Sequence, residues 1–275
     1  VRAAPPRGGG RAGAARERIA RMNAAAAAGE LRLALVGVPN CGKTALFNRL
    51  TGSHQKVANY AGVTVERKEG RFTGASGRRY RLLDLPGAYS LTPTSLDEAI
   101  TRDAVLGRLA GEPPPEVVVC VVDATTLRLN LRLVLELRAL GLPLVVALNM
   151  SDIARARGYH VDREALAAQL GLPVVETVAV AAGGAHALID ALDRQPPPPP
   201  RRAPAYRDPT PAEVVETQRE ARRTLDATGY REPARQRALA RLDAVVLHPL
   251  AGLLVLALLL FAIFQAVFSW AVLPM

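Results

Sequence analysis

The chain has 275 residues, of which 49% are hydrophobic and 22% are charged, and its formal net charge at pH 7 is +10. It is long enough to bury one core of ordinary size and still carry further segments. Two cysteines in different contexts exclude a disulfide framework and a cysteine metal cluster, so we expect a reducing compartment. The arginines concentrate in two flanking regions, residues 2–21 and 201–241, and we expect no nucleic-acid partner.

The chain begins with a basic extension. Residues 1–30 are rich in arginine, alanine and glycine and hold no long apolar stretch, which argues against a secretory signal. We expect this extension to be disordered, with a short helix near residues 19–28. The apolar run 31–36 (LRLALV) predicts a buried strand, and the residues from Ala45 onward continue with helical spacing. A polar loop is expected over residues 51–62.

The next segments alternate between strand and helix patterns. Residues 63–67 and 80–84 flank the turn 74–77 and predict a β-hairpin. The continuous apolar runs 116–123 and 144–149 predict parallel strands covered on both faces. A further strand is expected at 174–177, and helices are expected at 127–140, 163–170 and 185–192. The fold class is therefore α/β: a three-layer domain over residues 31–195 with a mostly parallel sheet and one antiparallel hairpin.

A linker, a spacer and an apolar segment follow this domain. The prolines at 196–200 predict a stiff boundary, and two polar helices, 211–228 and 233–247, complete a spacer over residues 196–247. The run 250–272 carries no charge and would span about 34 Å as a helix, which is enough to cross a bilayer. The arginines that precede it place its N-terminal side in the cytoplasm. We expect residues 248–275 to hold either a single anchor or the first span of a larger membrane protein.

A phosphate-binding motif lies between the first strand and helix. GVPNCGKT fits the pattern G-x-x-x-x-G-K-[ST], in which glycines let several backbone N–H groups point at one phosphate. The lysine reaches the β- and γ-phosphates, and the hydroxyl ligates Mg²⁺. The nucleotide-binding residues predicted here are Gly37, Val38, Pro39, Asn40, Cys41, Gly42, Lys43, Thr44 and Ala45.

A second motif, DLPG, follows the second hairpin strand. Asp84 at the end of a strand beside the phosphate loop would hold Mg²⁺ through water, and the Gly87 amide would contact a γ-phosphate and move when it leaves. Leu85 and Pro86 complete the motif. Taken alone, the same four residues are equally typical of a simple strand-ending turn.

A nucleotide switch also needs a mobile threonine before the hairpin. Thr64 occupies that place, next to Gly62 and Val63, and its hydroxyl would complete the Mg²⁺ sphere only while the γ-phosphate is present. On its own, it is also typical of a β-branched residue that starts a strand.

The motif NMSD after the strand 144–149 selects the base. An aspartate accepts two hydrogen bonds from the N1–H and amino groups of guanine, and adenine offers no such donor pair. Asn149 would join this loop to the phosphate loop. Three motifs in this order predict a P-loop GTPase domain that binds GTP and GDP. The residues predicted on the guanine side are Asn149, Met150, Ser151, Asp152, Ala179 and Val180.

These motifs resemble one family, the bacterial ferrous-iron transporter FeoB. The resemblance covers residues 31–192 and resumes at 242–274, and NYAGVTVERKEG, LLDLPGAYSL, NMSD and the apolar run carry it. It implies an N-terminal GTPase domain, a spacer that favours GDP binding, and a polytopic membrane domain that carries Fe²⁺. It places residues 1–247 on the cytoplasmic side of the bacterial inner membrane. The implied partners are that membrane domain, which we expect outside this sequence, small cytosolic accessory proteins of iron uptake, and further copies of the chain.

The resemblance also bears on catalysis. It implies that Asn40 helps to coordinate K⁺. The residue after DLPG is Ala88, where many regulatory GTPases carry a water-orienting glutamine, so we expect slow hydrolysis, on the order of 10⁻² s⁻¹ or below. The residues expected to act in hydrolysis are Lys43, Thr64, Gly87 and Asn40.

Two alternatives stay open at this point. The net charge of +10 would also suit a ribosome- or RNA-associated assembly GTPase, although the apolar run 250–272 favours a membrane protein. Ala88 would also suit a membrane-bound module that is gated by GTP without hydrolysing it. The spacer departs from the family pattern, because it is short, rich in arginine and interrupted by Pro233.

Overall fold

The computed structural model of the chain describes residues 30–52, 55–60, 63–109, 111–196, 206–234, 242–244 and 246–270. The chain divides into two compact units, Val1–Tyr230 and Arg231–Met275. The expected short helix near residues 19–28, the proline boundary after residue 196 and most of the polar helix 233–247 lie outside the described residues.

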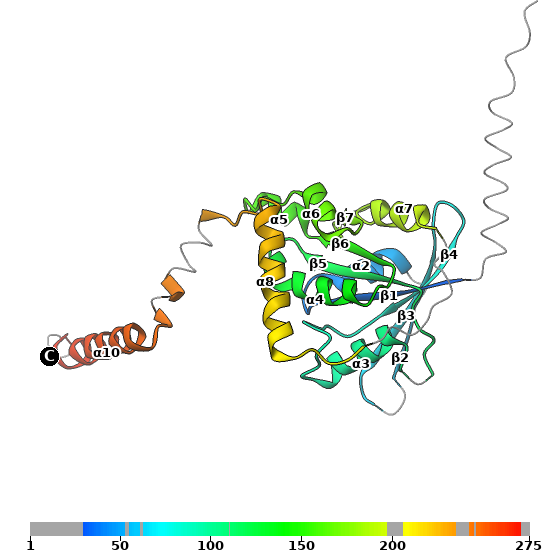
Figure 1. Ribbon diagram of the computed structural model, residues 1–275. Helices are drawn as coiled ribbons and strands as arrows, with labels where there is room; N and C mark the ends of the chain where they lie inside the picture. Colours follow the sequence, from blue (N-terminus) through cyan, green and yellow to red (C-terminus); the bar gives the residue numbers. More distant parts are fainter. Residues whose placement is uncertain are drawn as a thin grey trace, which may run out of the picture. The chain divides into compact units, whose positions relative to one another are not determined.

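A seven-stranded sheet forms the centre of the first unit, in the order β2-β3-β4-β1-β5-β6-β7 (Figure 1). The pairs β2–β3 and β3–β4 are antiparallel, and all other neighbouring strands are parallel. The strands are β1 (Leu31–Gly37), β2 (Gln55–Asn59), β3 (Glu66–Thr73), β4 (Arg79–Asp84), β5 (Val117–Asp123), β6 (Leu144–Asn149) and β7 (Val174–Glu176).

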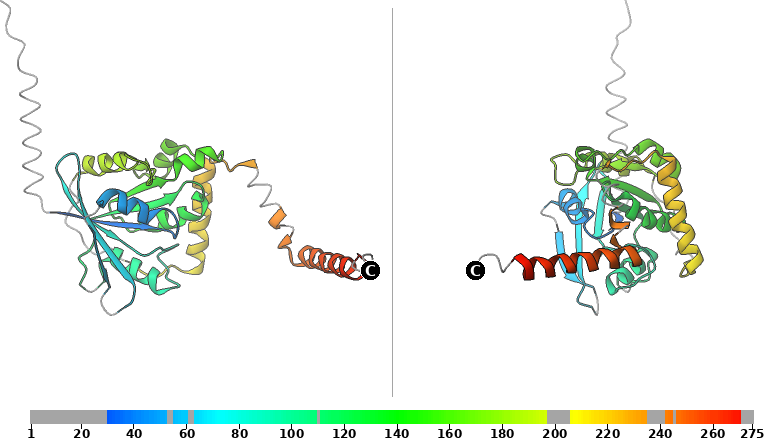
Figure 2. Two further views of the ribbon diagram at one scale, coloured as in Figure 1. Left: turned by 180° about the vertical axis from the view of Figure 1, so that it is seen from behind. Right: turned by 90° about the vertical axis from the view of Figure 1, so that its left-hand side faces the viewer.

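Helices cover both faces of this sheet. Figures 1 and 2 show α2 on one face and α4 on the other, with α8 as a further layer outside α4. All side chains of β5 and β6 are buried, as strands between two helical layers require. The helices are α2 (Lys43–Thr51), α3 (Leu96–Leu106), α4 (Leu127–Ala139), α5 (Ser151–Ala156), α6 (Arg163–Leu170), α7 (His186–Arg194) and α8 (Pro211–Ala227).

The α/β architecture expected from the sequence is confirmed, but the prediction of a polar loop over residues 51–62 is wrong in part. It contains β2, which pairs with β3 through backbone hydrogen bonds although all five of its side chains are exposed. The hairpin strand expected from residue 63 begins only at Glu66. The strand β2 was missed because a strand at the edge of a sheet is held by its backbone and needs no buried side chain.

Two helices lie where no helix was expected. In α3, the Ser95 hydroxyl accepts a hydrogen bond from the Glu98 amide at 3.3 Å, and this Ser-x-x-Glu spacing is a start signal that the sequence displays. The short helix α5 begins inside the NMSD motif, directly after Met150, whose φ of 58° is left-handed. The expected polar helix 211–228 is present as α8, which begins with a capping box between Thr210 and Glu213.

The second unit holds one long apolar helix. It consists of α10 (Pro249–Gln265) and a π-helical turn η1 (Ala266–Trp270). Within the described residues, Pro249–Phe268 is a candidate membrane span of 20 residues with a mean hydropathy of 2.7 and no burial inside the structure. An apolar helix that is exposed all round is typical of a segment that meets lipid.

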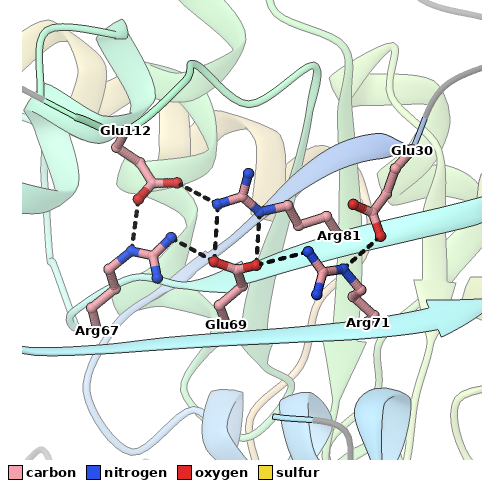
Figure 3. A network of polar contacts seen from close by, with 6 residues as sticks. All are labelled: Glu30, Arg67, Glu69, Arg71, Arg81 and Glu112. Atoms are coloured by element: carbon pink, nitrogen blue, oxygen red, sulfur yellow. Dashed lines mark hydrogen bonds and ion pairs between the residues drawn. The ribbon is translucent and has the colours of Figure 1, made fainter. Parts of the chain in front are cut away.

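An ion-pair network fixes the hairpin β3–β4 (Figure 3). Glu69 on β3 accepts hydrogen bonds from the guanidinium groups of Arg67 at 2.6 Å and Arg81 at 2.9 Å. Burial raises the pKa of Glu69, but the hydrogen bonds and charges of Arg81 and Arg67 outweigh it and hold the pKa below its ordinary value. The members of the network are Glu30, Arg67, Glu69, Arg71, Arg81 and Glu112.

We expect Glu69→Gln to lower the free energy of unfolding of residues 1–230 by about 1–3 kcal/mol at pH 7, because the partly buried Arg67 and Arg81 lose their shared anion. The folded-state pKa of Glu69 is depressed, so its contribution is complete above the unfolded pKa and is lost as pH falls through the folded pKa. The gap between wild type and variant should therefore narrow below about pH 4. Urea unfolding at several pH values measures it.

The matched control is Glu176→Gln, which removes an ion pair with Arg155 whose two side chains are 39% and 69% exposed. Its effect should stay within about 0.5 kcal/mol. Equal losses in the two variants would contradict a special role for the network.

Candidate functional site

Four neighbouring strands end at the same edge of the sheet. In the parallel register, Leu35 of β1 lies opposite Asp84 of β4, and Asp123 at the end of β5 lies opposite Asn149 at the end of β6. Because parallel strands carry their loops at their carboxyl ends, the three motifs of the sequence meet at this edge.

The phosphate loop bends between β1 and α2 at two left-handed residues, Asn40 with φ 65° and Gly42 with φ 84°. Gly37 serves a different purpose from the bend expected of it: a Cβ there would lie 2.6 Å from the Val121 carbonyl oxygen of β5. Close packing against the neighbouring strand therefore requires a glycine at that position. A Cβ at Gly42 would likewise lie 2.2 Å from the Asn149 amide nitrogen.

A cavity of about 510 Å³ opens at the N-terminus of α2. Backbone N–H groups at a helix N-terminus attract anions. The predicted Gly87 lies in the same wall as the phosphate loop, and Asp97 of α3 is a lining residue that the sequence analysis missed. The lining residues are Val38, Pro39, Asn40, Gly42, Lys43, Thr44, Ala45, Gly87 and Asp97.

Cys41 belongs to the phosphate loop but does not line this cavity, and it is buried. Burial raises the pKa of its thiol to about 11, so the group is protonated at neutral pH and packs as a small apolar side chain. Its backbone carbonyl has the more specific role, because it accepts a hydrogen bond from Asn149.

Lys43 and Asp84 form an ion pair between the first two motifs. The Asp84 side chain is buried and that of Lys43 is largely buried, with 6% and 11% exposure. Burial raises the pKa of Asp84, and the positive charge of Lys43 opposes that rise. The structure thus brings together the residue expected at the phosphates and the residue expected at Mg²⁺.

The segment after Asp84 runs along the phosphate loop. The Leu85 amide donates to the Leu35 carbonyl at 3.1 Å, and the Ala88 amide donates to the Gly37 carbonyl at 3.1 Å. A Cβ on Gly87 would lie 2.9 Å from the Pro39 ring, so this contact requires glycine.

Two carboxylates from helices hold the next part of this segment. Glu98 accepts hydrogen bonds from the amides of Tyr89 at 3.1 Å and Thr94 at 2.8 Å, and Glu136 of α4 accepts from the Leu91 amide at 2.6 Å. On the other side, the Tyr206 hydroxyl donates to the Leu91 carbonyl at 2.7 Å. Leu91 is therefore bonded both to α4 and to the residues that lead into α8.

Asn149 joins the guanine-side loop to the phosphate loop, as its place in the motif predicts. Its buried amide nitrogen donates to the Cys41 carbonyl at 3.0 Å, and its oxygen accepts from the Ala179 amide at 3.1 Å and the Thr177 hydroxyl at 3.2 Å. The Ser151 hydroxyl donates to the Thr177 carbonyl at 3.2 Å.

The remaining predicted residues lie around this frame. Asp152 in α5 is exposed, and the Val180 side chain is 75% exposed. In the part of the chain that the structure describes, Val63 and Thr64 precede β3 and do not line the cavity, and Gly62 lies outside the described residues. Arg49 of α2, which the sequence analysis missed, donates to the backbone carbonyls of the guanine-side loop.

We expect Asn149→Ala to lower the free energy of unfolding of residues 1–230 by about 2–4 kcal/mol without nucleotide, because a buried carbonyl and a buried amide lose their partner. Asp152→Ala, the control in the same motif, removes an exposed carboxylate and should cost less than about 1 kcal/mol. Urea unfolding in nucleotide-free buffer compares them. Equal stability of Asn149→Ala and wild type would disprove the structural role.

Known proteins with similar sequences and folds identify the family of this chain. Residues 31–192 match the family model described as ferrous iron transport protein B. The Fe(2+) transporter FeoB of Escherichia coli strain K12 is 48% identical over 169 residues, which are 60% of this chain and 21% of that protein. The chain thus spans about a fifth of the length of the curated relatives it matches.

Solved structures of the cytosolic domain of the T. maritima FeoB iron transporter are similar in fold. Its GDP form has a TM-score of 0.55 at 40% identity and covers 61% of this chain and 65% of that chain. Its GMPPNP form has a TM-score of 0.62 at 26% identity and covers 74% of this chain and 100% of that chain. The fold is that of the P-loop GTPase domain of this family. With the family model matched over more than half of its residues, the chain belongs to the ferrous iron transport protein B family.

Proposed function

We propose that the chain binds GTP and GDP and hydrolyses GTP slowly, as the cytosolic part of a bacterial ferrous-iron transporter. The observation that carries this proposal is a cavity lined by Lys43, Thr44 and Gly87, whose phosphate loop is joined through Asn149 to the guanine-side loop. The T. maritima relative in its GDP and GMPPNP forms supports a guanine nucleotide as the ligand.

Base selection falls to Asp152. Its carboxylate is exposed at the start of α5, on the loop that Asn149 fixes to the phosphate loop. From there it accepts hydrogen bonds from the N1–H and amino groups of guanine. Adenine has no matching donor pair and would leave the carboxylate without a partner.

The side chains proposed for Mg²⁺ have the chemistry that suits a hard cation, although of the three only Thr44 lines the cavity in this structure. Hydroxyl and carboxylate oxygens are the ligands that Mg²⁺ takes in proteins, and Thr44, Thr64 and Asp84 would hold it. When bound, Mg²⁺ neutralises charge on the phosphates. Asp84 is ion-paired with Lys43, so nucleotide binding requires the lysine to turn from this carboxylate toward the phosphates. Its flexible four-carbon side chain allows that movement.

Ala88, the residue after DLPG, accounts for the slow GTP hydrolysis that we propose. Ala88 is fully buried and its amide is bonded to Gly37, so neither its methyl group nor its amide orients an attacking water. Backbone groups of the loop and a monovalent cation would supply the stabilisation that remains. Asn40, held in a left-handed conformation at the wall of the cavity, would coordinate K⁺ with its side-chain oxygen.

The nucleotide would act as a switch for iron uptake. Loss of the γ-phosphate would reshape residues 53–64 and 84–95, and the second of these segments contacts Glu136 of α4 and Tyr206 before α8. The spacer would pass this change to a polytopic membrane domain that carries Fe²⁺. The span Pro249–Phe268 supports a location in the bacterial inner membrane, with residues 1–247 in the cytoplasm. Accessory proteins of iron uptake and further copies of the chain are proposed as partners.

The base assignment is tested with Asp152→Asn. The asparagine side chain places an N–H donor where the aspartate accepted a hydrogen bond from guanine. GTP affinity should therefore fall by about 100-fold or more, while affinity for xanthosine triphosphate rises, because xanthine has a carbonyl in place of the amino group. Titration calorimetry with both nucleotides measures this exchange. Asp190→Asn, an exposed carboxylate on α7, is the matched control and should change neither affinity. Unchanged GTP binding by Asp152→Asn would refute the assignment.

The cation assignment is tested by phosphate release in KCl and in NaCl. Hydrolysis should be faster in KCl, and Asn40→Gly, which keeps the left-handed backbone but removes the amide, should abolish the difference while GDP still binds. Rapid turnover in NaCl that Asn40→Gly leaves unchanged would count against K⁺. Absence of phosphate release in a single turnover would identify a module that binds GTP without hydrolysing it.

A further inference from the structure

Arg49 makes a bidentate contact that none of the motifs includes. It lies in the last turn of α2, and its Nε donates to the Ala179 carbonyl at 3.1 Å while its Nη2 donates to the Val180 carbonyl at 2.8 Å. A planar guanidinium is suited to this arrangement because it presents two parallel N–H groups. The contact joins residues 130 and 131 positions apart in the chain.

The guanine-side loop has other contacts besides Arg49: the Ala179 side chain is buried in the core, and the Ala181 amide donates to the Val178 carbonyl at 2.9 Å. On its inner side, Asn149 holds the Ala179 amide, and the Val178 amide donates to the Gly184 carbonyl at 3.0 Å. The Val180 side chain is 75% exposed, so packing holds it weakly. Among the described residues, Arg49 therefore fixes the outer side of the loop through its bond to the Val180 carbonyl.

Through its position on α2, Arg49 connects the guanine-side loop to the helix that begins at the phosphate cavity. The same helix begins at Lys43, beside the phosphate cavity, and ends near Arg49. A ligand bound by both loops is held at its phosphates by the first turn of α2 and at its base by a loop that the last turn positions. Opening of the guanine-side loop would break these two bonds before the base is released.

We propose that Arg49 is a positioning residue that sets the residence time of guanine nucleotides by holding the Ala179–Val180 backbone against α2. This inference rests on the proposed function, and it concerns the rate of release, because Arg49 contacts the guanine-side loop and does not line the phosphate cavity.

The experiment uses the full chain in detergent and a GDP that carries a fluorescent group on its ribose. Stopped-flow displacement should show release about tenfold faster from Arg49→Ala than from wild type, with a nearly unchanged association rate. Arg49→Lys should also release faster, because an ammonium does not reproduce the two parallel bonds. Arg194→Ala is the matched control: it removes an exposed arginine that donates to the Asp190 carbonyl, and release should not change.

A second readout separates loop positioning from general damage to α2. Inorganic tripolyphosphate contacts the phosphate loop alone, so its affinity should be the same in wild type and Arg49→Ala. Equal release rates for GDP, or a parallel loss of tripolyphosphate affinity, would overturn the inference. If the wild-type chain binds tripolyphosphate but no GDP, the proposed function fails together with it; if wild type binds GDP and Arg49→Ala releases it at the same rate, this inference alone fails.

Discussion

The side-chain amide of Asn149 joins loops that come from three separate parts of the chain. It ends β6, donates to the phosphate loop after β1 and accepts from the loop after β7. Because these bonds are buried, each lost partner would leave a polar group without water. The binding edge of the sheet therefore keeps one geometry, and every contact proposed for a nucleotide presupposes it.

Local patterns predict the parts of this edge that depend on local chemistry. The phosphate loop needs glycines within a short span, and the strands β5 and β6 need continuous apolar residues, so both are visible in the sequence. The strand β2 is different, because its residues QKVAN bury no side chain and backbone hydrogen bonds with β3 fix it in the sheet. A pattern of side chains carries no information about such a pairing.

Contacts between distant segments account for the rest. Nothing near Arg49 in the sequence indicates that it will reach Ala179, and nothing near Glu136 indicates that it will accept the Leu91 amide. The prediction for Gly37 was also wrong, because a glycine is required there by the close approach of Val121 on the next strand and not by a bend. These features depend on which elements become neighbours in the fold. A single sequence does not reveal those neighbours before the fold is known.

Leu91 is held from two directions, by Glu136 through its amide and by Tyr206 through its carbonyl. If a γ-phosphate draws the segment after Gly87 toward itself, it acts against both bonds, and a load that pulls Tyr206 away acts against the bond to the Leu91 carbonyl. Two influences that act on the same equilibrium change each other's affinity by the same factor. Tension on the residues that lead into α8 would thus change the affinity of the site for nucleotide. In turn, a bound nucleotide would change the force at which Tyr206 separates from Leu91.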